Sequence, residues 1–265
     1  MAVAPDYLRH IADESARFRA VLRTTTPGAV VPTCPEWDAA DLVWHLAEVQ
    51  SFWSRIVQQR CSSPEQLTGD DPARPDRYDD LLDLAAQSAK ELGKVLKKTA
   101  PDTAVWTWAE DQSVGFVLRR QAHEALIHRV DAECTVDDRS PLDVALATDG
   151  VDEALRVMFA GAPPGANLTV DALATVRLRT TDSAASWLVR LARFDNPEGE
   201  GEHTAGPTLV VEEEDHGLPA AATVSAGAGD LDCWLWGRPP LGSVDLSGDV
   251  KVLAGLRAVV DTGIS

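Results

Sequence analysis

The periodicity of apolar residues changes once along this chain, and that change limits the folds open to it. Up to about residue 160, apolar side chains recur every three or four positions, the spacing of one helix face. Beyond that point they alternate with polar residues, as in a half-buried strand. The change falls in the sequence GAPPG at residues 161–165, where glycine and proline interrupt regular structure. The sequence therefore predicts an α+β protein with two domains, residues 1–161 and 166–265.

The first domain is expected to be an antiparallel bundle, because long amphipathic segments follow one another with short breaks. The expected helices cover residues 4–24, a segment from about 38, and residues 78–99, 113–133 and 141–161. Asp38 is a favourable N-cap for the second of these helices. The two prolines at residues 31–37 fix the backbone, which predicts a stiff loop there.

The second domain shows several short runs with strand-like alternation. The strand candidates are residues 168–180, 186–194, 209–211 and 222–224, and the helical candidates are residues 230–236 and 249–261. This order predicts a small antiparallel sheet with helices on one face.

Charge and composition exclude several classes of function. The chain has 42 acidic and 24 basic residues, a formal net charge of -18 at pH 7. Such a surface repels phosphate backbones and anionic lipids, so we expect neither nucleic acid nor a membrane as partner. No apolar run reaches the roughly 18 residues of a membrane-spanning helix, and no secretory signal is evident, which predicts a cytoplasmic protein. We expect a monomer or a small homo-oligomer.

Glu124 and His128 are the first candidates for metal ligands. They lie four residues apart on an expected helix, so both side chains leave the same face and can share an ion. His123 is about 140° from His128 around the helix axis, which favours a packed residue over a ligand. The pair supplies two ligands, whereas a catalytic metal ion usually takes three from the protein.

The third ligand must come from another helix, and His45 is the best candidate. It lies on the apolar face of its expected helix, where a bare imidazole needs a partner. Two imidazoles and one carboxylate suit Zn²⁺ or a similar divalent ion. Asp131 is placed to orient one of the ligands from behind.

Simpler interpretations of the same residues remain open. A Glu and a His four residues apart often form a solvated pair, and a histidine on an apolar face is often a core residue. Asp41 and Glu48, one turn away on either side, are placed to satisfy His45 within its own helix.

Other polar residues give weaker signals. We expect His10 to form a surface pair with neighbouring carboxylates, and His203 and His216 to belong to a solvated acidic edge or a surface metal site. The four cysteines are scattered without a C-x-x-C pair, which favours reduced, mostly buried thiols. The glycine-rich signatures of nucleotide sites and the G-x-S-x-G hydrolase motif are absent from the sequence.

Three segments resemble the motifs of one known family. Residues 31–46 contain VPTCPEW and then DLVWHL, residues 120–131 read RQAHEALIHRVD, and residues 230–238 read DLDCWLWGR. In this order they resemble the mycothiol-dependent maleylpyruvate isomerase family over nearly the whole chain. The resemblance implies a DinB-like four-helix bundle that binds a divalent metal. It also implies a small α/β domain with an antiparallel sheet, similar to sterol-carrier folds.

The resemblance further implies roles for particular residues. It assigns metal ligation to His45, Glu124 and His128, and a functional arginine to Arg238. The implied cofactors are a divalent metal, most simply Zn²⁺, and the thiol mycothiol, with a small electrophile as substrate. We therefore expect a thiol transferase or isomerase in which a metal-held thiolate attacks the substrate. The alternatives are a metal-dependent hydrolase and a non-enzymatic ligand-binding protein.

Overall fold

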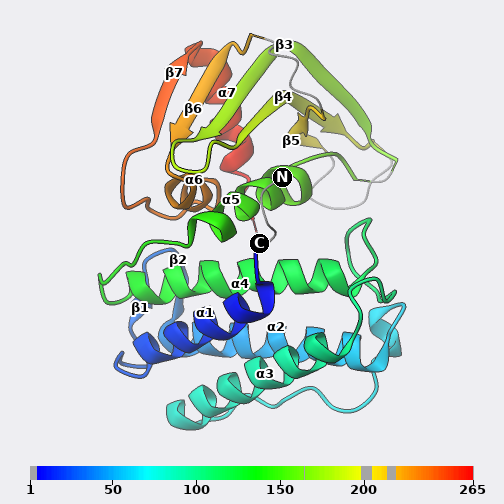
Figure 1. The fold of residues 1–265 in the computed structure, drawn as a ribbon, viewed down its shortest axis with the longest axis vertical. Coiled ribbons are helices and arrows are strands. Elements are labelled where there is room, and N and C mark those ends of the chain that lie inside the picture. Colours follow the sequence, from blue (N-terminus) through cyan, green and yellow to red (C-terminus); the bar gives the residue numbers. More distant parts are fainter. Residues whose placement is uncertain (1–4, 164, 198–204, 214–218, 265) are drawn as a thin grey trace. The chain divides into compact units, whose positions relative to one another are not determined.

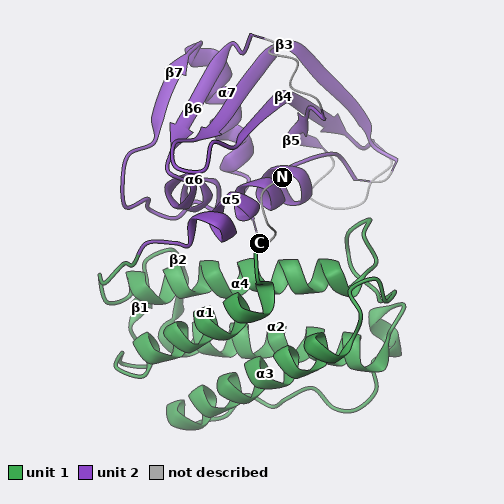
Figure 2. Ribbon diagram, viewed as in Figure 1, with its two compact units in different colours: residues 1–140 green, residues 141–265 purple. Residues whose placement is uncertain are grey.

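The computed structural model describes residues 5–163, 165–197, 205–213 and 219–264 (Figure 1). The chain divides into two compact units, residues 1–140 and 141–265, which Figure 2 colours separately. Each unit has its own hydrophobic core. The first unit is mainly helical and the second is a sheet with helices, which confirms the prediction of an α+β protein. No helix among the described residues combines the length and the apolar character that crossing a membrane requires.

Four long helices form the first unit, as the family resemblance implied. They are α1 (Tyr7–Leu22), α2 (Ala39–Gln59), α3 (Tyr78–Lys98) and α4 (Val114–Cys134). The closest pairings are α1 with α4 and α2 with α3. A short 3-10 helix, Pro64–Gln66, lies in the connection between α2 and α3.

The segment before α2 is a small hairpin where the sequence predicted only a stiff loop. β1 (Val30–Val31) pairs antiparallel with β2 (Cys34–Asp38). The backbone N–H of Asp41 donates to the Asp38 carboxylate, and the N–H of Asp38 donates to the Asp41 carboxylate. This reciprocal capping box fixes where α2 begins, and with it the face on which His45 stands.

α4 is buried along most of its length and carries unusually many buried polar side chains. These are Arg120, Gln121, His123, His128, Arg129, Asp131 and Glu133. Some join the helices: Arg129 donates to Glu14 of α1 at 2.8 Å and to Glu133 at 2.9 Å. Because buried charges must be paired or hold an ion, α4 is the element on which a functional site is to be sought.

A five-stranded sheet and three helices form the second unit. The strands are β3 (Asn167–Thr180), β4 (Ser186–Asp195), β5 (Ala205–Val211), β6 (Ala222–Ala226) and β7 (Asp245–Gly248). The helices are α5 (Val144–Glu153), continued by the π-helical turn Ala154–Met158, α6 (Ala228–Leu235) and α7 (Val250–Val260).

The sheet differs from the prediction in two respects. Its order is β5-β4-β3-β6-β7, and β3 pairs with β6 in parallel, whereas the other pairs are antiparallel. β7 was not predicted, because its four residues are all exposed and show no apolar alternation. The parallel pair requires a crossover between β3 and β6, and β4 and β5 lie within it.

The boundary between the compact units falls earlier than the composition suggested. It lies between Ser140 and Pro141, about twenty residues before the predicted boundary at residue 161, and places α5 in the second unit. The physical reason is packing, because Val151 and Leu155 belong to the core beneath the sheet. The glycine- and proline-rich break marks where α5 leads into the sheet rather than where the units part.

Candidate metal centre

α2 and α4 bring the three predicted ligands together. Oε1 of Glu124 lies 3.3 Å from Nε2 of His45 and 3.1 Å from Nε2 of His128. One donor atom from each residue lies within 4.8 Å of the other two. In the part of the chain that the structure describes, this is the single group of His, Cys, Asp or Glu with such geometry.

The simpler interpretations of these residues do not describe the structure. His45 pairs with Glu124 across the bundle, while Asp41 takes part in the helix cap and in an ion pair with Arg74. The Glu124–His128 pair is not a solvated one, since the side chains are only 15% and 9% exposed.

His128 is held from behind by a short chain of hydrogen bonds. Its Nδ1 lies 3.0 Å from Oδ2 of Asp131, and the hydroxyl of Thr33 donates to Oδ1 of Asp131 at 2.6 Å. An ionised carboxylate only accepts hydrogen bonds, so Nδ1 carries a proton. The orientation of the ring is thereby fixed with Nε2 facing Glu124 and His45, as predicted for Asp131.

Glu124 is held in a similar way by an arginine. The guanidinium of Arg120, one turn earlier on α4, donates to Oε2 of Glu124 at 2.8 Å. Oε1 faces the two histidines. One oxygen of the carboxylate is therefore bound by Arg120, and the other points to the centre of the cluster.

The electrostatics of the cluster favour a positive charge at its centre. Burial alone would raise the pKa of Glu124, but His128, together with His45 and Arg120, holds that pKa well below its ordinary value. Burial would lower the pKa of His128, but Glu124 and Asp131 raise it to about 9. A buried carboxylate therefore stays ionised, and a proton on His128 supplies the compensating charge.

The residues present fit a divalent cation. The donor set is two imidazole nitrogens and one carboxylate oxygen, all converging from two helices, and it matches the three-ligand sets of catalytic zinc. The atoms not turned to the centre, Nδ1 of His128 and Oε2 of Glu124, are bound by the protein, as is usual behind metal ligands.

Three residues of the site were not assigned from the sequence: Trp37, Arg120 and Thr33. The Trp37 ring lies 4.7 Å from the His45 ring and 6.3 Å from that of His128, so it covers one side of the cluster. Trp37 and Thr33 belong to the VPTCPEW motif directly before α2. Their place in this motif was the available signal in the sequence. It could not assign a role to either residue, because that role depends on how the hairpin folds over α4.

The other candidate residues lie elsewhere. His123 is buried, and the centre of its ring lies 6.3 Å from that of Tyr7 in an edge-to-face arrangement, as expected of a packed residue. The prediction for His10 was wrong, because this side chain is only 3% exposed, and burial removes it from the surface. His203 and His216 lie outside the described residues.

Arg238 belongs to the second unit, just after α6. Its guanidinium donates to the carbonyl of Trp236 at 2.7 Å and lies 6.0 Å from the centre of the Trp236 ring. Its catalytic role stays a prediction.

Fold and site together define a class: a four-helix bundle with a partly buried His–Glu–His cluster, joined to an α/β unit. Two family descriptions match the sequence. The mycothiol maleylpyruvate isomerase N-terminal domain matches residues 8–133, and the C-terminal domain of the same family (MDMPI) matches residues 145–255. The chain belongs to the mycothiol maleylpyruvate isomerase family, as the sequence motifs predicted.

Solved structures agree with this assignment at the level of the fold. The chain is similar to the crystal structures of the mycothiol-dependent maleylpyruvate isomerase and of a histidine-to-alanine mutant of that enzyme. Each is 15% identical to this chain, with a TM-score of 0.56 and coverage of 92% of this chain and 93% of the other. No curated protein matches the sequence significantly.

Proposed function

We propose that this chain is a metal-dependent isomerase or transferase that uses a low-molecular-weight thiol, mycothiol, on a small electrophilic substrate. The observation that carries the proposal is the convergence of His45, Glu124 and His128 within 4.8 Å, in a member of a family named for such an isomerase. His45, Glu124 and His128 would hold a divalent cation, most simply Zn²⁺.

In this proposal the bound cation activates the thiol as a nucleophile. A cation at this site would lower the pKa of a thiol ligand, and the thiolate is a nucleophile that can add reversibly to an electrophilic carbon. None of the four cysteines of the chain is needed as nucleophile, because the sulfur comes with the cofactor.

The residues of the chain prepare the site for these groups. Asp131 keeps the Nδ1 proton on His128, so that Nε2 is the nitrogen offered to the cation. Arg120 holds Oε2 of Glu124 and, after His128 and His45, adds to the lowering of the pKa that keeps the carboxylate ionised. Trp37 covers the His45 ring on one side. Arg238 is proposed to bind a substrate carboxylate or to stabilise developing negative charge.

Metal content of the purified protein tests the proposal directly. We expect about one equivalent of a divalent metal in protein kept from chelators, and its loss in a His128→Ala variant. His123→Ala is the matched control, since this histidine lies on α4 outside the cluster, and we expect it to retain the metal. Full metal retention by His128→Ala contradicts the ligand assignment.

Thiol dependence separates the proposed activity from the alternatives. We expect isomerisation of maleylpyruvate, or conjugation of a comparable electrophile, only when mycothiol is present. Turnover that persists undiminished without thiol would indicate a hydrolase instead. Protein without any stoichiometric metal would favour a ligand-binding protein that retains the bundle as a scaffold.

A further inference from the structure

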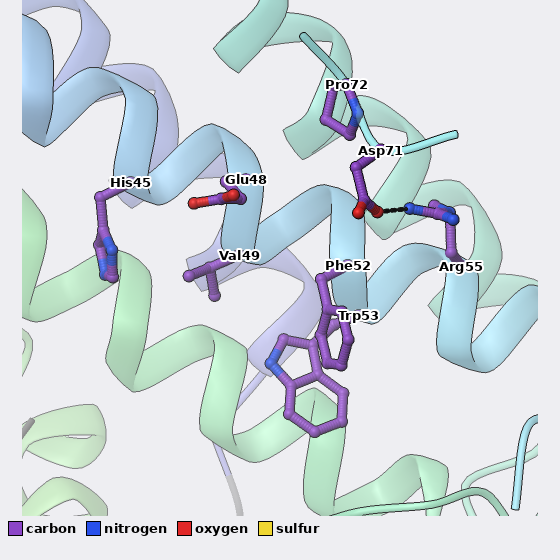
Figure 3. A pocket seen from close by; sticks show the side chains of 8 residues that line it. All are labelled: His45, Glu48, Val49, Phe52, Trp53, Arg55, Asp71 and Pro72. Atoms are coloured by element: carbon purple, nitrogen blue, oxygen red, sulfur yellow. Dashed lines mark hydrogen bonds and ion pairs between the residues drawn. The ribbon is translucent and has the colours of Figure 1, made fainter. Parts of the chain in front are cut away.

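A pocket of about 330 Å³ opens beside His45 and follows α2 for almost three turns (Figure 3). Its walls come from α2 and from residues 71 and 72 in the connection to α3. Because His45 is both a lining residue and a proposed metal ligand, a molecule held at the metal centre extends naturally into this pocket. The inference below therefore rests on the proposed function.

The inner wall of the pocket is apolar and preformed. Trp53, only 6% exposed, stacks on Trp106 with ring centres 5.8 Å apart and an angle of 13° between the planes. Phe52 meets both tryptophans edge to face, at 5.1 and 6.1 Å. Rings fixed by one another offer a rigid surface to the carbon skeleton of a ligand.

The positive charge in the pocket is already used by the protein. Arg55, the one cationic side chain among the described lining residues, pairs with the carboxylate of Asp71. The same guanidinium also donates to the carbonyls of Thr68 and Gly69, at 3.3 and 2.9 Å. Arg55 is thus engaged on three sides and is poorly placed to bind an anionic ligand.

The carboxylate of Glu48 lines the pocket without a cationic partner among the described residues. Its side chain is exposed, and no described residue forms a hydrogen bond or an ion pair with it. Figure 3 shows its carboxylate directed along α2 toward His45. A ligand held at the metal centre therefore meets the carboxylate of Glu48. This group accepts hydrogen bonds from the ligand and repels any carboxylate that the ligand carries.

We propose that this pocket binds the part of the thiol ligand beyond its sulfur. In this proposal Glu48 is a specificity-determining residue, which selects hydroxyl or ammonium groups over carboxylates at that position. A hydroxyl donates a charge-assisted hydrogen bond to Glu48, while its carbon atoms rest on Phe52 and Trp53. The selected ligand class is a hydroxylated or cationic thiol rather than a thiol acid.

Two small thiols of similar size test the selection. Thioglycerol carries hydroxyl groups beyond its sulfur, and mercaptopropionate carries a carboxylate there. The full chain is loaded with Co²⁺, and each thiol is titrated while the sulfur-to-cobalt charge-transfer absorption is recorded. This readout measures binding and needs no substrate.

The proposal predicts that the wild type binds thioglycerol more tightly than mercaptopropionate. In Glu48→Gln, which keeps the side-chain size, we expect the affinity for mercaptopropionate to rise about three- to tenfold, the effect of one charge roughly 6 Å away in a wet site. Glu48→Lys should reverse the preference. Glu91→Gln is the control, because it removes one negative charge on α3 at a different pocket.

The possible outcomes separate this inference from the proposed function. If the band forms in Glu48→Gln but the ratio of the affinities for thioglycerol and mercaptopropionate stays that of the wild type, the role of Glu48 is overturned. Metal–thiol binding is then left intact. An equal change in Glu91→Gln also overturns it, since the effect would then be one of overall charge. The absence of a band with both thiols overturns the proposed function and the inference together.

Discussion

Nδ1 of His128 donates to Oδ2 of Asp131 at 3.0 Å, so the imidazole presents only its Nε2 to Glu124 and His45. Asp131 is completely buried, and its second oxygen is bound by Thr33. A residue that is not one of the three candidate ligands thus orients one of them.

Replacing Asp131 is therefore expected to weaken metal binding without removing a ligand. We expect Asp131→Asn to lower the affinity for Zn²⁺ about 10- to 100-fold, because the amide no longer fixes the proton on Nδ1 as a carboxylate does. Competition with a chromophoric chelator measures the change.

Thr33 gives a graded control for that experiment. Thr33→Val removes the hydroxyl that orients Asp131 and should reduce affinity in the same direction but less, whereas Thr33→Ser keeps the hydroxyl and should bind as the wild type does. Equal affinities in all three variants would show that this hydrogen-bonded chain does not act on the metal.

The two histidines should differ in their effect on stability when the metal is absent. The side chain of His45 is 31% exposed and its hydrogen-bond partner is Glu124, so His45→Ala should change the free energy of unfolding by no more than about 0.5 kcal/mol. His128→Ala removes the ring that pairs with Oδ2 of the buried Asp131 and should cost about 1–3 kcal/mol. Urea unfolding in the presence of a chelator measures both. A reversed order would contradict the burial of His128.

Glu133 should make the first unit sensitive to acid. Burial alone would raise its pKa, but hydrogen bonds from Ser140 and Arg17, with the charge of Arg129, hold that pKa below its ordinary value. Its stabilising contribution is therefore complete above the unfolded-state pKa of about 4.5 and is lost as pH falls through the lower, folded-state pKa.

A Glu133→Gln variant tests this pH dependence. At neutral pH we expect it to be less stable than the wild type by about 3 kcal/mol, since two arginines lose their buried partner. The difference should shrink as the pH falls below about 4.5. Asp138→Asn is the control: Asp138 also pairs with Arg17 but is 75% exposed, so a change of at most about 1 kcal/mol is expected. A difference that stays constant with pH would contradict the assignment.

Gly150 and Gly93 make a matched pair for packing. A Cβ at Gly150 of α5 would lie 2.6 Å from Oδ2 of the buried Asp232, so Gly150→Ala should destabilise the second unit by about 1–3 kcal/mol. A Cβ at Gly93 of α3 would meet no atom within 4 Å, so Gly93→Ala should stabilise the helix by about 0.5–1 kcal/mol. Thermal unfolding followed by circular dichroism compares them, and a stabilised Gly150→Ala would refute the close approach of α5 and α6.

Local patterns in the sequence were sufficient for much of this fold. Helical periodicity located α1, α3, α4 and the start of α2 to within a few residues, because one face of each helix must meet the core. The i, i+4 spacing put Glu124 and His128 on one side of α4 for the same reason, since helix geometry is set by the backbone alone.

Tertiary structure decided what depends on partners distant in the sequence. The pairing of His45 with Glu124, the hydrogen bond from Thr33 to Asp131, and the parallel pairing of β3 with β6 each join segments at least 40 residues apart. The assignment of α5 to the second unit likewise follows from its contacts beneath the sheet. A local pattern determines which face of an element is apolar or polar, but the packing of whole elements determines which faces meet.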